Sequence, residues 1–327
     1  DRTTDFTIEK STRNRSSDFR ELFVVGFRTD RINEISRYIA MAKNFPKKNN
    51  LGSKSSGYSK KPDYKAIANA MPRPQQAGQN SKPQTFPKNW RQVAGTHAID
   101  ELIRVRAKSI KHFLIQKNWS SSADLRLLVE RLQKANIQFE EKSDVELQKI
   151  CHSHQGAVAF SDATPQFNYQ NAGWTQQSMI LALDGVEDPH NLGAILRTSW
   201  LMGVNGVITP EDRAVGLTAT VHKVACGGVE HVPMAQINNF SDPFKKLKED
   251  GFWVFGMSHK AEKTIYDMKI PDKVIWVMGA EDKGLRVTTE RACDELVSIP
   301  QVDAKASYNV SVATALALAE TKRQWKK

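Results

Sequence analysis

The chain has 327 residues, of which 40% are hydrophobic and 25% are charged, and its formal net charge is +11. This composition permits packed domains, and no apolar run reaches the roughly 18–20 residues that a membrane-spanning helix needs. The three cysteines, Cys151, Cys226 and Cys293, are far apart, which excludes a disulfide framework and a C-x-x-C zinc site. Residues 1–20 lack the apolar segment of a secretory signal. The sequence begins at Asp1 and not at a methionine, so Asp1 need not be the natural first residue. We therefore expect a cytoplasmic protein with no membrane contact.

The positive charge is concentrated at the N-terminus. Residues 1–88 contain 18 Lys and Arg against 8 Asp and Glu, a net charge of +10, whereas the remainder is near neutral. The stretch 42–90 is rich in Lys, Pro, Gly, Ser, Asn and Gln and cannot bury enough apolar area to offset its ordering entropy. We predict a basic, largely disordered N-terminal extension and linker over 1–90. Such an arm favours a polyanionic partner, nucleic acid first, with a role in solubility alone as the alternative.

Residues 91–160 are predicted to form a small α/β domain. The region 123–135 shows the clearest helical spacing, because Leu125, Leu128, Val129 and Leu132 fall on one face. The expected helices are 98–106, 123–135 and 144–150, and the expected strands are 112–115, 137–139 and 157–160. A Gln- and Asn-rich stretch, 161–177, is predicted to be a second linker.

Residues 178–327 alternate strands and helices, which predicts a parallel sheet covered on both faces. The expected strands are 179–184, 206–209, 232–235, 252–256, 274–278 and 295–299, and the expected helices are 192–202, 218–225, 243–249, 288–292 and 310–325. In such sheets ligands bind beyond the carboxyl ends of the strands, so the residues that follow each strand are the candidates for chemistry.

The first cluster follows strand 179–184. Asn191 is placed to cap the next helix, and Gly193 lies four residues before Arg197 on one helical face. We expect Gly193 to leave space over which the Arg197 side chain would lie, so that the guanidinium reaches the helix N-terminus, a place that attracts phosphate. A capping asparagine and a surface arginine are the alternative interpretation.

Two further clusters follow later strands. Gly279, Glu281 and Gly284 come directly after the most apolar strand, and the two glycines permit close approach of the backbone to a ligand. The third cluster, Ser307 to Ser311, precedes the last helix. Capping is the simplest role for its serines and asparagine, as a solvated loop acid is for Glu281.

Together and in this order, the clusters resemble the SpoU/TrmH family of SPOUT RNA 2′-O-ribose methyltransferases. Asn191, Gly193 and Arg197 match the family's N-x-G-x-x-x-R motif. Its other two motifs, G-x-E-x-x-G-L and S-L-N-x-S, are matched at the following positions: Gly279, Glu281, Gly284, Leu285, Ser307, Asn309 and Ser311. Tyr308 replaces the usual leucine. Residues 95–160 also resemble the family's small RNA substrate-binding domain.

The resemblance implies a C-terminal domain, 178–327, folded as a trefoil-knotted parallel sheet that binds S-adenosylmethionine mainly through backbone loops. It implies a homodimer with the site near the interface and no metal requirement, and the eight histidines form no H-x-x-x-H or H-E-x-x-H pattern. The residues expected to contact the methyl donor are Met257, Ser258, Met278, Gly279, Gly284, Ile299, Pro300, Tyr308 and Ser311.

The implied reaction is attack of a ribose 2′-oxygen on the sulfonium methyl. The family gives the motif arginine, here Arg197, the central role. Because an arginine side chain stays protonated in proteins, binding a phosphate and polarising the hydroxyl is a safer role than general base. Glu281 is expected to orient Arg197 by a bidentate pair, while Asn191, Ser307 and Asn309 hold the nucleotide and the donor.

The substrate is expected to be structured RNA, either ribosomal or transfer RNA. A dehydrogenase or an NTPase is disfavoured, because the sequence contains neither G-x-G-x-x-G after strand 179–184 nor G-x-x-x-x-G-K-[ST]. The remaining alternative is a non-catalytic RNA-binding protein that retains the fold.

Overall fold

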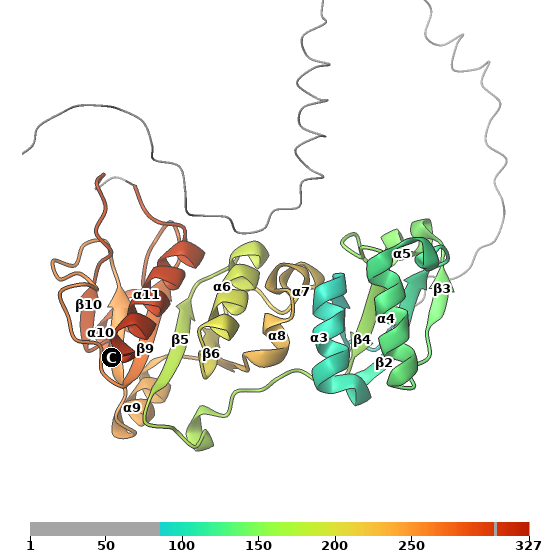
Figure 1. Cartoon of the computed structure of the whole chain (residues 1–327). Coiled ribbons are helices and arrows are strands. Elements are labelled where there is room, and N and C mark those ends of the chain that lie inside the picture. The colour runs from blue at the N-terminus through green and yellow to red at the C-terminus, as the bar shows by residue number, and fades with distance from the viewer. Residues whose placement is uncertain (1–85, 304–305, 327) are drawn as a thin grey trace, which may run out of the picture. The chain divides into compact units, whose positions relative to one another are not determined.

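The computed structural model describes residues 86–303 and 306–326, and the predicted basic arm lies outside these residues up to position 85 (Figure 1). The described residues belong to one compact unit, Asn80–Lys327. Among the described helices, none is both long and apolar enough to cross a membrane.

The first part of the described chain forms a four-stranded sheet with the order β1-β4-β2-β3. Only β2 and β3 run parallel, whereas β4 is antiparallel to both of its neighbours. The elements are β1 (Arg91–Ala94), α3 (Thr96–Arg106), η1 (Ala107–Ser109), β2 (Ile110–Gln116), η2 (Trp119–Ser121), α4 (Ala123–Lys134), β3 (Glu140–Lys142), α5 (Asp144–Ile150) and β4 (Ala157–Ser161).

Side chains alternate between two cores across this sheet, as the pleat requires. On β2, Phe113 and Ile115 pack with α3 and α4, whereas Leu114 packs with α5. The strand predicted at 137–139 is wrong: its apolar residues pack partly buried against the α3–α4 core, and the chain pairs with β2 only from Glu140 onward. An apolar run was sufficient for burial there but did not determine the register.

The second part forms a six-stranded sheet with the order β10-β8-β9-β5-β6-β7, and all neighbouring strands are parallel, which confirms the predicted α/β fold class with a parallel sheet. The trefoil knot stays a prediction. The elements are β5 (Ser178–Asp184), α6 (Pro189–Leu201), β6 (Gly206–Pro210), α7 (Ala219–Ala225), α8 (Gly228–His231), β7 (Met234–Ile237), α9 (Ser241–Glu249), β8 (Trp253–Met257), β9 (Lys273–Gly279), α10 (Val287–Ala292), β10 (Glu295–Val297) and α11 (Val310–Trp325).

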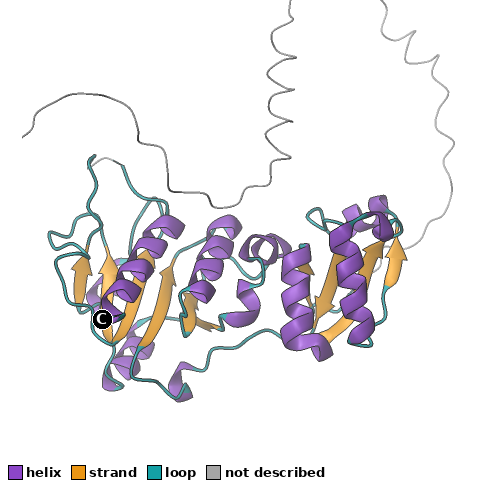
Figure 2. Ribbon diagram, viewed as in Figure 1, coloured by secondary structure: helices purple, strands orange, loops and turns teal. Residues whose placement is uncertain are grey.

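Helices cover both faces of the six-stranded sheet (Figure 2). The central strand β5 is buried at every position, and its residues alternate between two cores. Leu181 and Leu183 pack on the side of α6 and α11, whereas Ile180 and Ala182 pack on the side of α9. Burial on both faces explains why β5 reads as a continuous apolar run.

The strand order brings two of the sequence clusters together. From β5 the chain adds β6 and β7 on one side and then returns to form β8 and β9 on the other, so β5 and β9 become neighbours. Their register pairs Asp184 with Gly279, the last residue of each strand. The first two motifs therefore start from adjacent positions at one edge of the sheet, where such folds bind ligands.

The predicted linker 161–177 packs against the six-stranded sheet through aromatic side chains. Phe167 is buried, and a Cβ on Gly206 would lie 2.5 Å from its ring. Trp174 stacks edge-on against Phe252 and donates to Asp250 at 3.0 Å. This segment is therefore fixed at two points.

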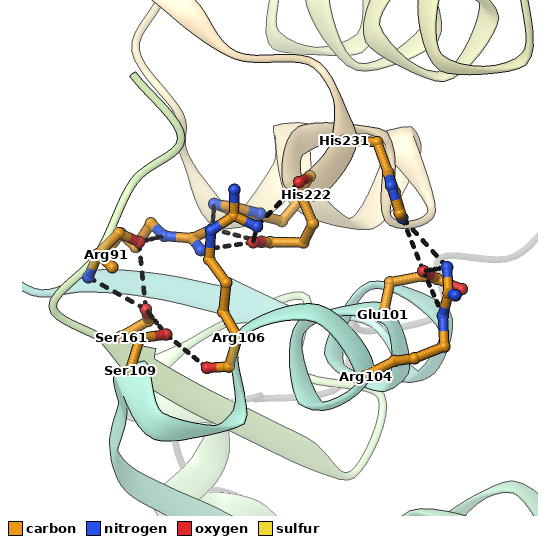
Figure 3. Close-up of polar contacts among 10 residues, drawn as sticks. Arg91, Glu101, Arg104, Arg106, Ser109, Ser161, His222 and His231 are labelled. Atoms are coloured by element: carbon orange, nitrogen blue, oxygen red, sulfur yellow. Dashed lines mark hydrogen bonds and ion pairs between the residues drawn. The ribbon is translucent and has the colours of Figure 1, made fainter. Parts of the chain in front are cut away.

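Buried charges join β1 and α3 to α7 and α8 (Figure 3). Arg91 donates two hydrogen bonds to Glu230, at 2.6 and 2.8 Å, and both side chains are almost fully buried. His222 lies 3.5 Å from the same guanidinium, and burial first, then the charge of Arg91, lowers its pKa to about 3. On the surface, Glu101 of α3 lies 2.8 Å from His231 of α8.

The buried imidazole of His222 predicts a pH-dependent stability. Its pKa is about 3 in the folded chain and about 6.5 when unfolded, so the unfolded state binds the extra proton between these values. The free energy of unfolding should therefore be unaffected above pH 6.5 and should fall by about 1.4 kcal/mol per pH unit as the pH drops toward 4. Urea unfolding of the parent and of His222→Gln at several pH values measures this slope. The variant should lack the part of the pH dependence that comes from the histidine. Equal slopes would contradict the buried neutral histidine.

Candidate active site

Three polar side chains, one from each predicted motif, meet in a hydrogen-bonded cluster. Glu281 accepts at one oxygen, Oε1, from the amides of Asn191 and Asn309, each at 2.8 Å. The amide of Asn309 also donates to Asn191 Oδ1 at 2.9 Å. The fold thus brings one side chain from each motif together, although the pairings differ from the expected ones.

The N-cap of α6 is Asp188 rather than the predicted Asn191. Asp188 accepts from the backbone N–H of His190 at 3.0 Å, and Pro189 occupies the first turn, where its missing N–H has no cost. That hydrogen bond is the main reason why the pKa of Asp188 lies below its usual value. Because the capping is done three residues earlier, Asn191 is free to bind Glu281.

Asn309 has two roles that use opposite ends of its amide. Its oxygen caps α11 by accepting from Ser311 N and Ser311 Oγ, at 2.9 and 2.6 Å. The oxygen is therefore occupied, and the amide nitrogen faces Glu281. Ser311, which was predicted to contact the donor, lies in this capping turn and lines neither of the two cavities described below.

Glu281 lies on a tight loop between β9 and α10. Ala280 and Gly284 exchange two backbone hydrogen bonds, at 3.1 and 2.8 Å, and Gly284 has a φ of 67°. A Cβ on Gly279 would lie 2.3 Å from the carbonyl carbon of Gly284, so no other residue fits there without movement of the backbone. The glycines of this motif are needed to close the loop.

An ion pair between a buried carboxylate and a partly exposed arginine fixes this loop to β5. The carboxylate of Asp184, which is fully buried, accepts from the backbone N–H of Arg286 at 2.9 Å and from its Nε. Burial alone would lower the pKa of Arg286, but the hydrogen bonds and charges of Asp184 and Asp212 outweigh this and raise it. The motifs do not indicate this pair, because Arg286 lies just beyond the second of them.

A cavity of about 650 Å³ lies beside the cluster, at the carboxyl ends of β8 and β9. Most of the predicted donor-binding residues line it, namely Met257, Ser258, Met278, Gly279, Gly284, Ile299 and Tyr308. Ser307 and Glu281 line it as well, whereas Pro300 and Ser311 do not. His259 and Lys260 also line the cavity. They were missed, although their position directly after β8 could have indicated them.

Tyr308 lies at the rim of this cavity with 42% of its surface exposed. Its hydroxyl donates to the backbone carbonyl of Pro300 at 3.1 Å, which satisfies the polar end of the ring. Pro300 thus acts by holding the tyrosine.

The cavity suits S-adenosylmethionine in size and in chemistry. Met278, Leu285 and Ile299 offer apolar surface to an adenine, and Lys260 offers a cation to a carboxylate. When bound, the donor supplies a methyl group on a sulfonium, which needs no further activation as an electrophile. The protein's own contribution is then to position and orient.

Arg197 is not part of the cluster in the single chain. Its side chain is exposed, lines neither cavity, and makes no hydrogen bond or ion pair with another described residue. The expected bidentate pair with Glu281 is therefore wrong here, since the asparagines bind that carboxylate. Gly193 does not clear space for Arg197 either. A Cβ on Gly193 would lie 2.6 Å from Val224, so this glycine allows α6 to pack closely on α7.

Two family models match the chain. The SpoU rRNA Methylase family matches residues 178–319, and the RNA 2′-O ribose methyltransferase substrate-binding domain matches residues 92–166. The chain is 39% identical over 241 residues to the 23S rRNA (guanosine-2′-O-)-methyltransferase RlmB of Neisseria meningitidis, covering 72% of this chain and 96% of the relative. The chain belongs to the SpoU family. RlmB of Escherichia coli K12 is 37% identical, covering 71% and 98%.

Solved structures of the SpoU family share the fold. The methyltransferase AviRb of Streptomyces viridochromogenes superposes with a TM-score of 0.62 at 18% identity, covering 72% of this chain and 90% of that one. Membership confirms the predicted SpoU/TrmH resemblance and, with it, an S-adenosylmethionine-dependent RNA ribose 2′-O-methyltransferase. The roles of individual site residues stay predictions.

The position of Tyr308 predicts how it contributes to donor affinity. If its ring covers the adenine, Tyr308→Ala should weaken binding of S-adenosylmethionine several-fold or more, since aromatic stacking adds about 1 kcal/mol to area burial. Tyr308→Leu should be nearly neutral. Tyr308→Phe is the matched control that removes only the hydrogen bond to Pro300. Calorimetry measures all four proteins, and an alanine variant that binds like the parent would exclude the ring from the donor site.

Proposed function

We propose that this chain transfers a methyl group from S-adenosylmethionine to the 2′-hydroxyl of a guanosine in 23S rRNA. The RlmB relatives carry that activity in their names, and the chain covers 96–98% of the N. meningitidis and E. coli sequences. The observation that carries the proposal is the Asn191–Glu281–Asn309 cluster beside a cavity that suits the donor. This arrangement favours an enzyme over a non-catalytic RNA-binding protein.

In this proposal each part of the chain has a separate function. Residues 91–160 bind the RNA substrate and residues 178–327 hold the donor and the reacting hydroxyl, with 161–177 as the linker between them. The basic residues of 1–90 add contacts to RNA phosphates, which would make RNA binding sensitive to salt. The enzyme acts in the cytoplasm, where rRNA is available.

Glu281 orients the attacking hydroxyl in this proposal. Its Oε1 is held by two amide donors, while its Oε2 has no hydrogen-bond partner among the described residues. A carboxylate anchored at one oxygen can accept a hydrogen bond at the other without losing its position. Asn191 and Asn309 keep the carboxylate in place, and Ser307 lies on the donor side.

We propose further that the chain works as a homodimer that brings Arg197 to the site of its partner. Arg197 lies on the exposed face of α6, and four residues later Leu201 is 70% exposed. Val312, on the neighbouring helix α11, is 46% exposed. Apolar side chains at the outer surface of two packed helices suit a two-fold contact, which would place each arginine near a second chain.

The product of the reaction tests the proposed function. Full-length protein is incubated with 23S rRNA and S-adenosylmethionine carrying a deuterated methyl group, and the RNA is digested to nucleosides for mass spectrometry. The expected product is 2′-O-methylguanosine. Transfer RNA is the parallel substrate and should accept little methyl. A methyl group on a base, or labelled transfer RNA without labelled rRNA, would contradict the proposal.

Mixed dimers test the place of Arg197. Arg197→Ala should lower methyl transfer by ~10²–10⁴-fold, and Asn309→Asp should do the same because it sets a carboxylate against Glu281. Both variants should still be dimers.

Co-expression with two affinity tags yields dimers that carry one variant in each chain. If the arginine acts on the partner's site, each mixed dimer contains one intact site and should recover about half of the parent's activity. Mixed dimers as inactive as the single variants would show that Arg197 acts within its own chain.

A further inference from the structure

A second cavity, of about 310 Å³, lies on the other side of the Glu281 loop. It shares a wall with the larger cavity, because residues 280–284 and Val310 line both. Its remaining lining comes from the segment that follows β5 and from Arg213 and Arg286. The donor is expected in the larger cavity, so the function proposed above names no ligand for the smaller one.

The shared wall is rigid. Ala280 and Gly284 are joined by two backbone hydrogen bonds. Gly185, at a φ of 94°, packs closely against this wall, because a Cβ on it would lie only 3.2 Å from the side chain of Ala280. Glu281 lies on this wall and is bound by Asn191, which lines the smaller cavity. A ligand in the smaller cavity therefore lies beside Glu281.

Several charged groups in the smaller cavity already have partners. Asp184 and Arg286 bind each other, and Asp188 caps α6. Four exposed side chains have no hydrogen bond or ion pair with the described residues, namely Glu187, Arg213, Asp282 and Lys283. Asp282 and Lys283 lie on the shared wall and also line the larger cavity, so Glu187 and Arg213 are the two that line the smaller cavity alone. Away from the shared wall, the cavity thus offers one free carboxylate acceptor and one free guanidinium donor.

These two groups match the edges of a guanine base. Among the four neutral bases, only guanine presents two adjacent donors, N1–H and N2–H, that one carboxylate can accept together. Its O6 and N7 acceptors suit an arginine. The volume lies at the lower end of the roughly 300–1,000 Å³ of small-molecule sites, which suits one nucleoside rather than a stretch of RNA.

We propose that the smaller cavity takes the base of the target guanosine after it leaves its stack, with Glu187 at the N1–N2 edge and Arg213 at O6 and N7. The ribose of that nucleoside then lies at the shared wall, with its hydroxyl beside Glu281. Enzymes that act on a base take it out of the stack in this way, and a guanine contacted at its N1–N2 edge must likewise be unpaired. The proposal rests on the proposed function and adds the residues that determine its base specificity.

Substituted RNA tests the contact with Glu187. The substrates are 23S rRNA fragments with guanosine or inosine at the methylated position, and inosine lacks the 2-amino group. The parent should prefer guanosine by ~10–100-fold in kcat/KM, the effect of one hydrogen bond to a charged group. Glu187→Gln should lower kcat/KM for guanosine by a similar factor and should bring the preference close to 1. Glu211→Gln, an exposed acid that lines neither cavity, is the matched control and should keep the parent's preference.

Arg213 allows a second substitution without strain. Its φ of 52° lies in the left-handed region, which asparagine tolerates, so Arg213→Asn removes the guanidinium while keeping the backbone. This variant should lower kcat/KM by ~10-fold or more on both substrates and should bind S-adenosylmethionine like the parent.

A binding measurement separates this proposal from the proposed function. Saturation-transfer NMR detects binding of guanosine to the full chain. S-adenosylhomocysteine saturates the donor cavity in this experiment, so the guanosine signal cannot come from that cavity. The parent should show a signal that Glu187→Gln loses, even if the methylation assay fails and the proposed function falls. An unchanged guanosine signal in Glu187→Gln, or an unchanged preference over inosine, would overturn the assignment of this cavity.

Discussion

The register between β5 and β9 is the constraint on which the site depends. It pairs Asp184 with Gly279, so two loops that are about 95 positions apart in the sequence leave the sheet side by side. The ion pair of the buried Asp184 with the partly exposed Arg286 fixes the second loop to the end of the first strand. Removing one partner of such a pair leaves an uncompensated buried charge, which is strongly destabilising. The position of Glu281 therefore follows from the sheet.

The alternation of strands and helices was sufficient to predict a parallel sheet, and the residues after its strands were sufficient to find the cluster. What the sequence could not supply was the partner of each side chain. Asn191 and Asp188 are both capping residues three positions apart, and only the observed helix start shows which one caps. The sequence predicts that Gly193 leaves space for the side chain of Arg197. In the structure this glycine instead allows its helix to pack closely against Val224 on another helix. Such contacts arise from packing between elements that are distant in sequence.

Buried charge also explains how α3 and β1 contact α7 and α8. Arg91 and Glu230 satisfy each other in a place that excludes water, and His222 beside them remains neutral. The short helix α8 was not predicted, because four residues carry no helical period, yet it supplies Glu230 and His231 to this contact. Trp200 of α6 stacks on His231 at 4.2 Å, so the helix that carries Arg197 also lies against the same contact.

We expect the donor to lie on one side of the Glu281 loop and the asparagine cluster to stay intact when it binds. A crystal structure of the full chain with S-adenosylhomocysteine tests this most directly. We predict that the ligand lies in the larger cavity, between Met257 and Tyr308, with Glu281 still bound by Asn191 and Asn309. A ligand in the smaller cavity, or a cluster that opens to bind it, would contradict the account.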